Sequence, residues 1–407
     1  MQTEIFSLSN GLRIIYLPSV SPVSYCGFAV NAGTRDENVR QFGLAHFVEH
    51  TLFKGTRKRK AWHILNRMEN VGGELNAYTT KEETFIYSIC LSEDIERAVE
   101  LLADLVFHSQ FPEAEIEKER EVVIDEINSY KDNPSELIFD EFEDLLFKGS
   151  ELGHNILGEE ETLNTFTSAS CREFVNTFYH PENMVFFFYG KTPFNKIIRL
   201  ATKYFLEKES VSVSERIRIT PGIVPPVKEK TGKDLHQTHA LIGGRAYSYH
   251  DNQRIGLFLL NNMLGGPGMN SRLNLSLREK YGLVYTVESG LTSFCDTGVF
   301  SIYFGCDHES QAKCLQLTYK ELKKFREVQL SASQLHAAVK QLKGQLGVSN
   351  DHRENVALGM GRSFLHFNKY ESLPEVYQKI DALTASQLLE IANAIFDEQA
   401  LSQLIFE

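Results

Sequence analysis

The sequence of 407 residues predicts an α+β fold built from two homologous domains of about 200 residues each. Three observations support this prediction. Strand and helix patterns alternate along the chain, a charged and proline-containing segment divides it near the middle, and the order of elements on the two sides of that segment is similar. A chain of this length is expected to form roughly two to three domains with substantial cores.

The first half starts with strand patterns and continues with helices. Residues 12–17 and 25–32 are rich in β-branched and aromatic residues and are bounded by Gly and Pro, which is typical of strands. Residues 43–53 and 62–71 have helical periodicity, and residues 76–89 return to strand character. Two further segments have helical periodicity: residues 95–107 and 112–130.

A composition shift separates the two halves. Residues 207–231 are charged, contain serines and include three prolines, so they are expected to form an interdomain linker. We place the predicted domain boundary here, giving a first domain of residues 1–210 and a second of residues 211–407.

The pattern of elements recurs beyond the linker. Residues 166–170 and 383–387 introduce similar helices at an offset of 217, and residues 111–116 and 330–335 correspond at an offset of 219. Two copies of one α+β unit are the simplest explanation of this recurrence, and chance similarity between two ordinary α/β patterns is the alternative.

The charge of the chain is uneven. The formal net charge is −12, which argues against nucleic acid or an anionic membrane as the main partner. Up to residue 210 there are 21 Lys and Arg against 34 Asp and Glu, a balance of −13, and the remaining 21 against 20 give +1. A cationic ligand would therefore be attracted to the first half.

Cysteine usage and hydropathy give no indication of a dense disulfide framework, an export signal or a transmembrane span. The six cysteines form no C-x-x-C pair, so we expect buried reduced thiols and no zinc knuckle or redox motif. No apolar run approaches 18 residues, and the first residues do not have the pattern of an export signal. A cytoplasmic location is the expectation that follows.

A short motif in the first predicted helical segment, residues 43–53, indicates a metal site. His46 and His50 are four residues apart, so on a helix they share one face and can reach one Zn²⁺. Glu49 lies on the same side of the helix. A carboxylate beside a metal-activated water can accept a proton from it and later pass a proton to a leaving amine. The alternative is a pair of histidines with only a packing role.

A catalytic zinc site requires a third protein ligand. The predicted helix of residues 112–130 offers Glu119 and Glu126, which are seven apart and therefore lie close to one face. Spacing alone does not choose between them, because this segment is crowded with carboxylates and most must be solvated.

These residues, taken with their surroundings, resemble the inverted zinc signature of the insulinase/pitrilysin metallopeptidases, and most closely their processing-peptidase-like branch. The similarity includes H-x-x-E-H, the residues around it and motifs in the second half. The segments that carry it are residues 31–37, 43–56, 73–80, 119–126, 153–158, 264–273 and 277–285.

The resemblance implies roles for individual residues. Three residues are implied to bind one zinc per chain: His46, His50 and Glu126. Glu49 is implied to be the general base that acts on a zinc-activated water, and Glu119 is implied to be a supporting acid. Asn76 and Ala77 are implied to lie on an edge strand that binds the peptide backbone of the substrate. Arg278 and Tyr285, from the second half, are implied to contact the substrate and to take part in catalysis.

The resemblance also implies a mainly antiparallel sheet packed with helices in each domain, and a chamber closed by two chains. The expected activity is zinc-dependent cleavage of short or unfolded peptides, and the acidic first half favours basic ones. A homodimer is expected because one chain carries both motifs, and a heterodimer remains open. The second half has Ala338 and Gln345 where the first has Glu119 and Glu126, so it is expected to bind no metal. The competing interpretation is a non-catalytic scaffold or partner subunit.

Overall fold

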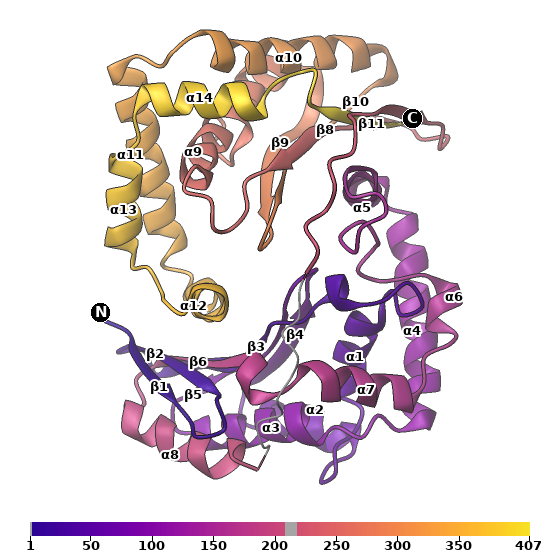
Figure 1. Ribbon diagram of the computed structural model, residues 1–407, viewed down its shortest axis with the longest axis vertical. Helices are drawn as coiled ribbons and strands as arrows, with labels where there is room; N and C mark the ends of the chain where they lie inside the picture. Colours follow the sequence, from indigo (N-terminus) through magenta and orange to yellow (C-terminus); the bar gives the residue numbers. More distant parts are fainter. Residues whose placement is uncertain (1, 208–217) are drawn as a thin grey trace. The chain divides into compact units, whose positions relative to one another are not determined.

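The computed structural model describes residues 2–207 and 218–407 (Figure 1). The chain forms two compact units, each assembled from more than one segment. Unit 1 consists of Met1–Ser129, His154–Arg218 and Asn350–Glu371. Unit 2 consists of Tyr130–Gly153, Ile219–Ser349 and Ser372–Glu407.

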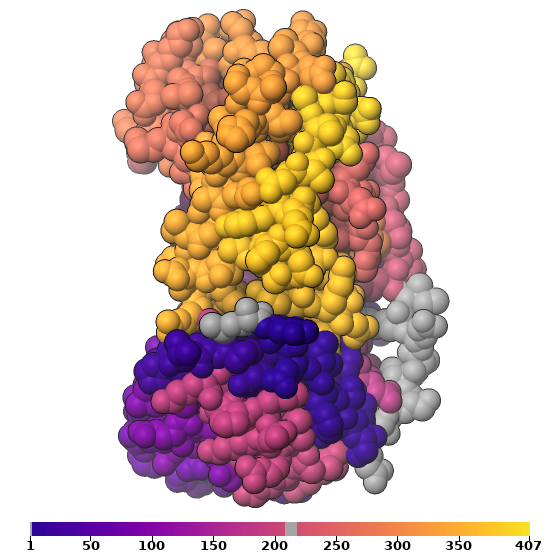
Figure 2. Space-filling model, turned by 90° about the vertical axis from the view of Figure 1, so that its left-hand side faces the viewer, coloured from indigo at the N-terminus to yellow at the C-terminus, as the bar shows by residue number. Residues whose placement is uncertain are grey.

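Unit 1 contains a six-stranded sheet with the order β1-β2-β6-β3-β5-β4. All of its neighbouring pairs are antiparallel except the β2–β6 pair. That pairing joins residues near the start of the chain to residues near position 190, and Figure 2 shows indigo and pink atoms side by side on the surface of this unit. The strands are β1 (Glu4–Ser7), β2 (Arg13–Pro18), β3 (Val23–Val30), β4 (Glu74–Thr79), β5 (Thr84–Leu91) and β6 (Met184–Gly190).

Helices cover both faces of this sheet. The side chains of a strand alternate between faces, so Ile14 and Phe186 belong to one buried cluster and Ile15 and Phe187 to another. An uninterrupted apolar run such as that of β6 is what burial on both faces requires. The helices of unit 1 are α1 (Leu44–Leu52), α2 (Ala61–Glu69), α3 (Ile95–His108), α4 (Glu113–Lys131, whose last two residues fall in unit 2), α6 (Glu160–Leu163), α7 (Ser168–Phe178), α8 (Phe194–Phe205), α12 (Arg353–Phe367) and the short η1 (Thr34–Asp36) and η2 (Pro181–Asn183).

Unit 2 repeats this plan with a five-stranded sheet of order β7-β11-β8-β10-β9. Only the β7–β11 pair is parallel. The strands are β7 (Lys228–Thr231), β8 (Thr238–Ala246), β9 (Val284–Ser293), β10 (Gly298–Cys306) and β11 (Ser402–Phe406). The helices are α5 (Pro134–Leu146), α9 (Arg254–Gly265), α10 (Gln311–Glu327), α11 (Ala332–Ser349), α13 (Leu373–Asp381), α14 (Ala385–Ile395) and the short η3 (Asn274–Glu279) and η4 (His308–Ser310).

The duplicated elements agree with the offsets seen in the sequence. Helices α7 and α14 begin and end 217 residues apart, and Thr167 and Thr384 cap them with the same side-chain hydrogen bond to the third residue of the helix. Helices α4 and α11 begin 219 residues apart. The predicted α+β fold of two homologous domains, each with a mainly antiparallel sheet packed with helices, is therefore confirmed.

Each half of the sequence contributes one helix to the unit formed mainly by the other half. Helix α12 packs on β6, β3 and β2 of unit 1, where Met360 and Phe364 join the cluster of Ile15 and Phe187. Helix α5 packs on β8 and β11 of unit 2. The sequence patterns do not predict this exchange. The boundary predicted between residues 210 and 211 lies outside the described residues and stays a prediction.

Two local features add detail to these expectations. Residues 76–89 have the expected strand character and belong to a hairpin of β4 and β5 that turns at residues 80–83. The end of the segment expected to be a linker contains β7, which pairs with β11. Within the described parts of the chain, none of the helices is long and apolar enough to cross a membrane.

Candidate metal centre

The H-x-x-E-H motif lies on α1, as expected. The ring centroids of His46 and His50 are 4.5 Å apart, and Glu49 lies on the same helix between them. His46 is buried, whereas the side chain of His50 keeps 22% of its exposure. Helical spacing thus brings both imidazoles to one place at the edge of the core of unit 1.

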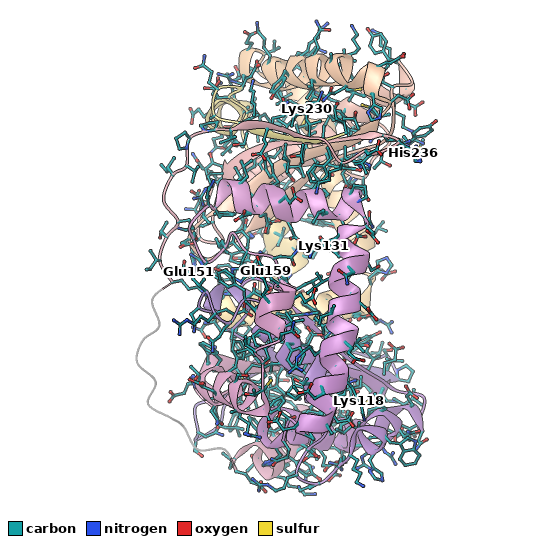
Figure 3. All side chains as sticks on the ribbon, turned by 90° about the vertical axis from the view of Figure 1, so that its right-hand side faces the viewer. Lys118, Lys131, Glu151, Glu159, Lys230 and His236 are labelled. Atoms are coloured by element: carbon teal, nitrogen blue, oxygen red, sulfur yellow. The ribbon has the colours of Figure 1, made fainter. Side chains whose placement is uncertain are left out.

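Glu126 completes a three-residue group on the neighbouring helix α4, the long helix on which Lys118 and Lys131 are labelled in Figure 3. Its Oε2 lies 3.6 Å from Nε2 of His50 and 3.9 Å from Nε2 of His46. Ligand atoms bound tetrahedrally to zinc lie about 3.4 Å from one another. Two imidazole nitrogens and one carboxylate oxygen at these separations fit a zinc ion after small side-chain movements.

Glu119 supports the three-residue group by contacting His50. Its Oε1 lies 3.0 Å from Nδ1 of His50, and its Oε2 pairs with Lys54 at 2.6 Å. Burial would raise the pKa of Glu119, but the hydrogen bonds and charges of His50 and Lys54 outweigh it and lower that pKa. An ionised carboxylate can only accept, so His50 donates to Glu119 through Nδ1, and Nε2 is the ring nitrogen left to face Glu126.

The two histidines differ in their protonation. Burial, helped by the nearby His50, lowers the pKa of His46 to about 3, so its imidazole is neutral and able to bind a metal. Burial also acts to lower the pKa of His50, but Glu119, Glu49 and Glu126 outweigh it and raise that pKa. Protons and a metal ion therefore compete more strongly at His50 than at His46.

Glu49 has the environment of a general base. Its Oε2 accepts a hydrogen bond of 2.7 Å from the hydroxyl of Thr79, at the end of β4. Burial raises the pKa of Glu49, and the hydrogen bond from Thr79 opposes part of that rise. A carboxylate with its pKa moved towards neutrality transfers protons more effectively at physiological pH. The sequence did not single out Thr79, although it belongs to residues 73–80, one of the segments that carry the family resemblance.

The start of α1 is held by a buried acid that sequence reasoning also missed. Glu37 accepts the backbone N–H groups of Gly43 and Ala45 at 2.8 and 2.6 Å, and His154 Nε2 lies 3.0 Å from its Oε2. Because Gly43 caps α1 without a side chain, the carboxylate of Glu37 takes over the capping role. In the sequence, the segments that contain Glu37 and His154 are connected only by the family resemblance, and this contact is the physical link between them.

Gly43 also explains why glycine is needed in both segments. Its φ is +93°, and a Cβ there would meet the backbone of Gly158 at 2.8 Å. A Cβ on Gly158, whose φ is +74°, would in turn meet Gly43 at 2.7 Å. The two glycines let the chain pass close to the start of the helix that carries the histidines.

Asn76 and Ala77 lie on β4, the last strand in the order of the unit 1 sheet as the structure describes it. They pair with Tyr87 and Ile86 of β5 on one side only. Their predicted position on a sheet edge is what the structure shows. An edge strand presents unpaired backbone groups to a peptide.

Arg278 and Tyr285 lie together in unit 2, in a cavity of about 550 Å³. Tyr285 is 77% exposed, on β9, and Arg278 is on η3. Gln345, the position expected to correspond to Glu126, lines the same cavity, so the place matching a metal ligand has an amide. Three further lining residues, Phe258, Asn261 and Asn262 of α9, repeat the spacing of His46, Glu49 and His50. The cavity thus resembles the metal centre in layout without its ligands.

Two family models match the chain. The model described as insulinase (peptidase family M16) matches residues 13–160, which contain His46, Glu49, His50 and Glu126. The model described as the peptidase M16 inactive domain matches residues 165–342.

Curated relatives are similar over nearly the whole chain. The match to an uncharacterized zinc protease of Rickettsia bellii is 32% identical and covers 99% of this chain and 97% of that protein. The uncharacterized zinc protease YmxG of Bacillus subtilis is 30% identical over 98% of this chain and 97% of its own.

Solved structures have the same fold. A protease from Helicobacter pylori superposes with a TM-score of 0.90 at 22% identity and covers 100% of this chain and 99% of its own. A structure described as a peptidase M16 inactive domain from Pseudomonas fluorescens gives a TM-score of 0.93 at 18% identity, covering 100% and 98%. At these identities the structures establish the fold alone.

Proposed function

Because the chain belongs to the insulinase family of peptidases, peptidase family M16, we propose that it is a zinc-dependent endopeptidase whose zinc is held by His46, His50 and Glu126. The observation that carries the proposal is the convergence of these three side chains beside Glu49, with Glu119 fixing His50. The half-exposed side chain of Glu126 leaves the group open to solvent, as a catalytic site requires.

A zinc ion in this place would supply Lewis-acid chemistry, polarising water and the carbonyl of the scissile bond. Glu49 accepts the proton of the attacking water and returns a proton to the leaving amine. Thr79 keeps the carboxylate of Glu49 in place through its 2.7 Å hydrogen bond. Nε2 of each histidine would bind the metal, which displaces any proton from Nε2 of His50, and Glu119 holds the Nδ1 proton of His50.

Substrate binding is assigned to two places. The edge of β4 at Asn76 and Ala77 would add the peptide as a further strand, so that backbone hydrogen bonds provide affinity with little dependence on sequence. Tyr285 would donate to the carbonyl region of the substrate, with Arg278 beside it. The exposure of Tyr285 leaves its hydroxyl free to reach a ligand.

The substrate class proposed is short or unfolded peptides, with a preference for basic ones. The balance of −13 over residues 1–210 supports this preference, since a cationic peptide is attracted to an acidic surface. We also propose a homodimer, because the same chain carries the metal ligands and the Arg278–Tyr285 pair.

The alternative function is a non-catalytic scaffold or partner subunit. The family model described as an inactive domain is consistent with this alternative. That match begins at residue 165, however, after the four residues of the proposed metal centre. The first half retains Glu49 together with all three ligands, and a scaffold needs none of them. The observation therefore favours an enzyme with one metal-binding and one metal-free domain.

The test is digestion of a basic, unstructured peptide, followed by mass spectrometry before and after removal of metal with a chelator. Internal cleavage that is lost on chelation and restored by stoichiometric zinc supports the proposal. Glu121→Gln is the matched control variant, because Glu121 is exposed on α4 away from the group and its loss leaves cleavage unchanged. Absence of cleavage by the zinc-loaded protein supports the scaffold.

A further inference from the structure

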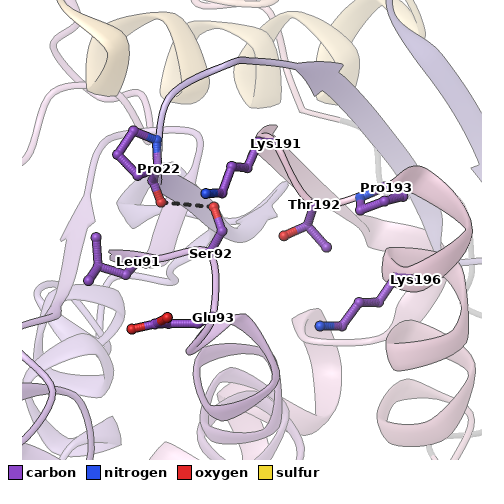
Figure 4. A pocket seen from close by; sticks show the side chains of 8 residues that line it. All are labelled: Pro22, Leu91, Ser92, Glu93, Lys191, Thr192, Pro193 and Lys196. Atoms are coloured by element: carbon purple, nitrogen blue, oxygen red, sulfur yellow. Dashed lines mark hydrogen bonds between the residues drawn. The ribbon is translucent and has the colours of Figure 1, made fainter.

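A second cavity in unit 1 has the chemistry of an anion site. It has a volume of about 410 Å³ and lies where β5 and β6 end and α3 and α8 begin (Figure 4). Cavities of this size accept small molecules. Its lining residues are Pro22, Leu91, Ser92, Glu93, Lys191, Thr192, Pro193 and Lys196.

The cavity is remote from the proposed metal centre. Thr79, which contacts Glu49, pairs with Thr84 at the start of β5, whereas Leu91 and Ser92 follow at the far end of that strand. Seven residues of extended strand span roughly 23 Å. A ligand here would not touch the metal ligands.

Helix α8 directs its positive end into the cavity. It has 12 residues, and no side chain caps its first turn, which follows Pro193. Uncapped N–H groups and the helix dipole favour an anion at this position. The neighbouring helix α3 does not add to this effect, since its start carries Asp94 and Glu96.

Two lysines add positive charge, and Glu93 is the single carboxylate among the lining residues. Within the described residues neither Lys191 nor Lys196 forms an ion pair. The nearby Glu96 is held instead by Lys203 and Tyr204, each at 2.9 Å. Lysines left unpaired beside a helix N-terminus are typical partners of phosphate groups.

Thr192 provides an independent sign of a ligand. Only 4% of its surface is exposed, and its side chain makes no hydrogen bond to any described residue. Figure 4 shows its hydroxyl turned towards the middle of the ring of lining side chains. A hydroxyl that has no protein partner and faces a cavity from an otherwise buried side chain is available to a ligand or to water.

We propose that this cavity binds a small phosphomonoester. The phosphate would accept hydrogen bonds from the start of α8, Thr192 and the two lysines, and the organic part would pack on the apolar side chains of Pro22, Leu91 and Pro193. Glu93 is the one carboxylate in the lining and opposes the anion. The site is separate from the peptidase activity proposed above and does not depend on it.

The test is calorimetric titration of the full-length, zinc-loaded chain with phenyl phosphate in a phosphate-free buffer, with inorganic phosphate and phenol as comparison probes. We expect saturable binding of phenyl phosphate, weaker binding of inorganic phosphate and no binding of phenol. Replacing both lysines (Lys191→Met with Lys196→Met) weakens binding by about tenfold or more, and Thr192→Val by several-fold. Glu93→Gln strengthens it.

The matched control is Arg199→Met, which removes a positive charge from an exposed position one turn further along α8. We expect this variant to bind as the wild type does. Absence of saturable binding, equal binding of phenol, or affinity unchanged in the lysine, Thr192 and Glu93 variants would overturn the proposal. Binding that disappears on chelation of zinc but persists in the lysine variants would also overturn it, by placing the anion at the metal.

Discussion

Nδ1 of His50 and Oε1 of Glu119 lie 3.0 Å apart, and this contact joins the helix of the H-x-x-E-H motif to the helix that carries Glu126. It fixes the orientation of one proposed ligand from a helix that supplies another. The carboxylate of Glu119 forms an ion pair with Lys54 in turn. The geometry of the proposed metal centre therefore depends on a residue that is not one of its proposed ligands.

The first prediction concerns this supporting acid. Glu119→Gln should weaken zinc binding by about 10- to 100-fold, because a neutral amide accepts more weakly from His50 and leaves Lys54 unpaired. Competition with a chromophoric chelator measures the dissociation constant. Glu121→Gln, on the exposed side of the same helix, should bind zinc as the wild type does. Equal affinity in the Glu119 variant would show that Glu119 does not support the ligand.

The second prediction separates substrate contact from metal binding. Tyr285→Phe should lower kcat/KM by about a hundredfold if the hydroxyl stabilises the reacting carbonyl. Zinc stoichiometry and unfolding should be unchanged, because this side chain is 77% exposed. Tyr281→Phe is the control, since Tyr281 is also exposed and lies four residues away. A Tyr285 variant with wild-type kinetics would contradict the assignment.

The third prediction concerns the cap of α1. In Glu37→Gln one of the two oxygens that accept from Gly43 and Ala45 becomes an NH₂ group facing an N–H donor. The free energy of unfolding should fall by about 1–3 kcal/mol, the cost of an unsatisfied buried group. Urea denaturation monitored by circular dichroism measures it, with Glu121→Gln as the exposed control. A loss no larger than that of the control would mean that the cap contributes little.

The fourth prediction concerns pH and the helix exchanged into unit 1. Glu83 lies within 2.9 Å of Nε2 of His366 and forms an ion pair with Arg362, both on α12. Burial would raise the pKa of Glu83, but His366 and Arg362 outweigh it and lower the pKa below that of the unfolded chain. The resulting stability is present above the unfolded pKa of about 4.3 and is lost as pH falls through the folded value.

Glu83→Gln should therefore reduce the free energy of unfolding by about 2 kcal/mol at pH 7 and by much less near pH 3. Urea denaturation at a series of pH values measures the difference. Glu69→Gln, at an exposed end of α2, should show no such pH dependence. A constant difference between wild type and the Glu83 variant across this range would rule out the linkage.

Local pattern was sufficient to locate much of the fold and the proposed centre. Helical spacing placed His46 and His50 on one face, and the similar segments 166–170 and 383–387 indicated the duplication. These features depend on residues close in sequence. The choice of Glu126 over Glu119 as a ligand was not available from spacing, because both lie on one face of α4, and it came from the resemblance.

Other features depend on contacts between residues far apart in sequence. Glu37 and His154 meet across 117 positions, and Tyr87 and Glu354 across 267. The exchange of α5 and α12 between units leaves no periodic signal of its own. The continuous apolar run of β6 was a sign that both faces of the sheet are covered, but it does not tell which helix covers them.

The most direct test of the account is to measure zinc content and peptide turnover in the wild type and in Glu49→Gln side by side. Glu49 is not a proposed ligand, so elemental analysis should give one zinc per chain in both proteins. Only the wild type should cleave a basic, unstructured peptide. Cleavage by Glu49→Gln at the wild-type rate, or a wild type that binds no zinc, would contradict the proposed centre.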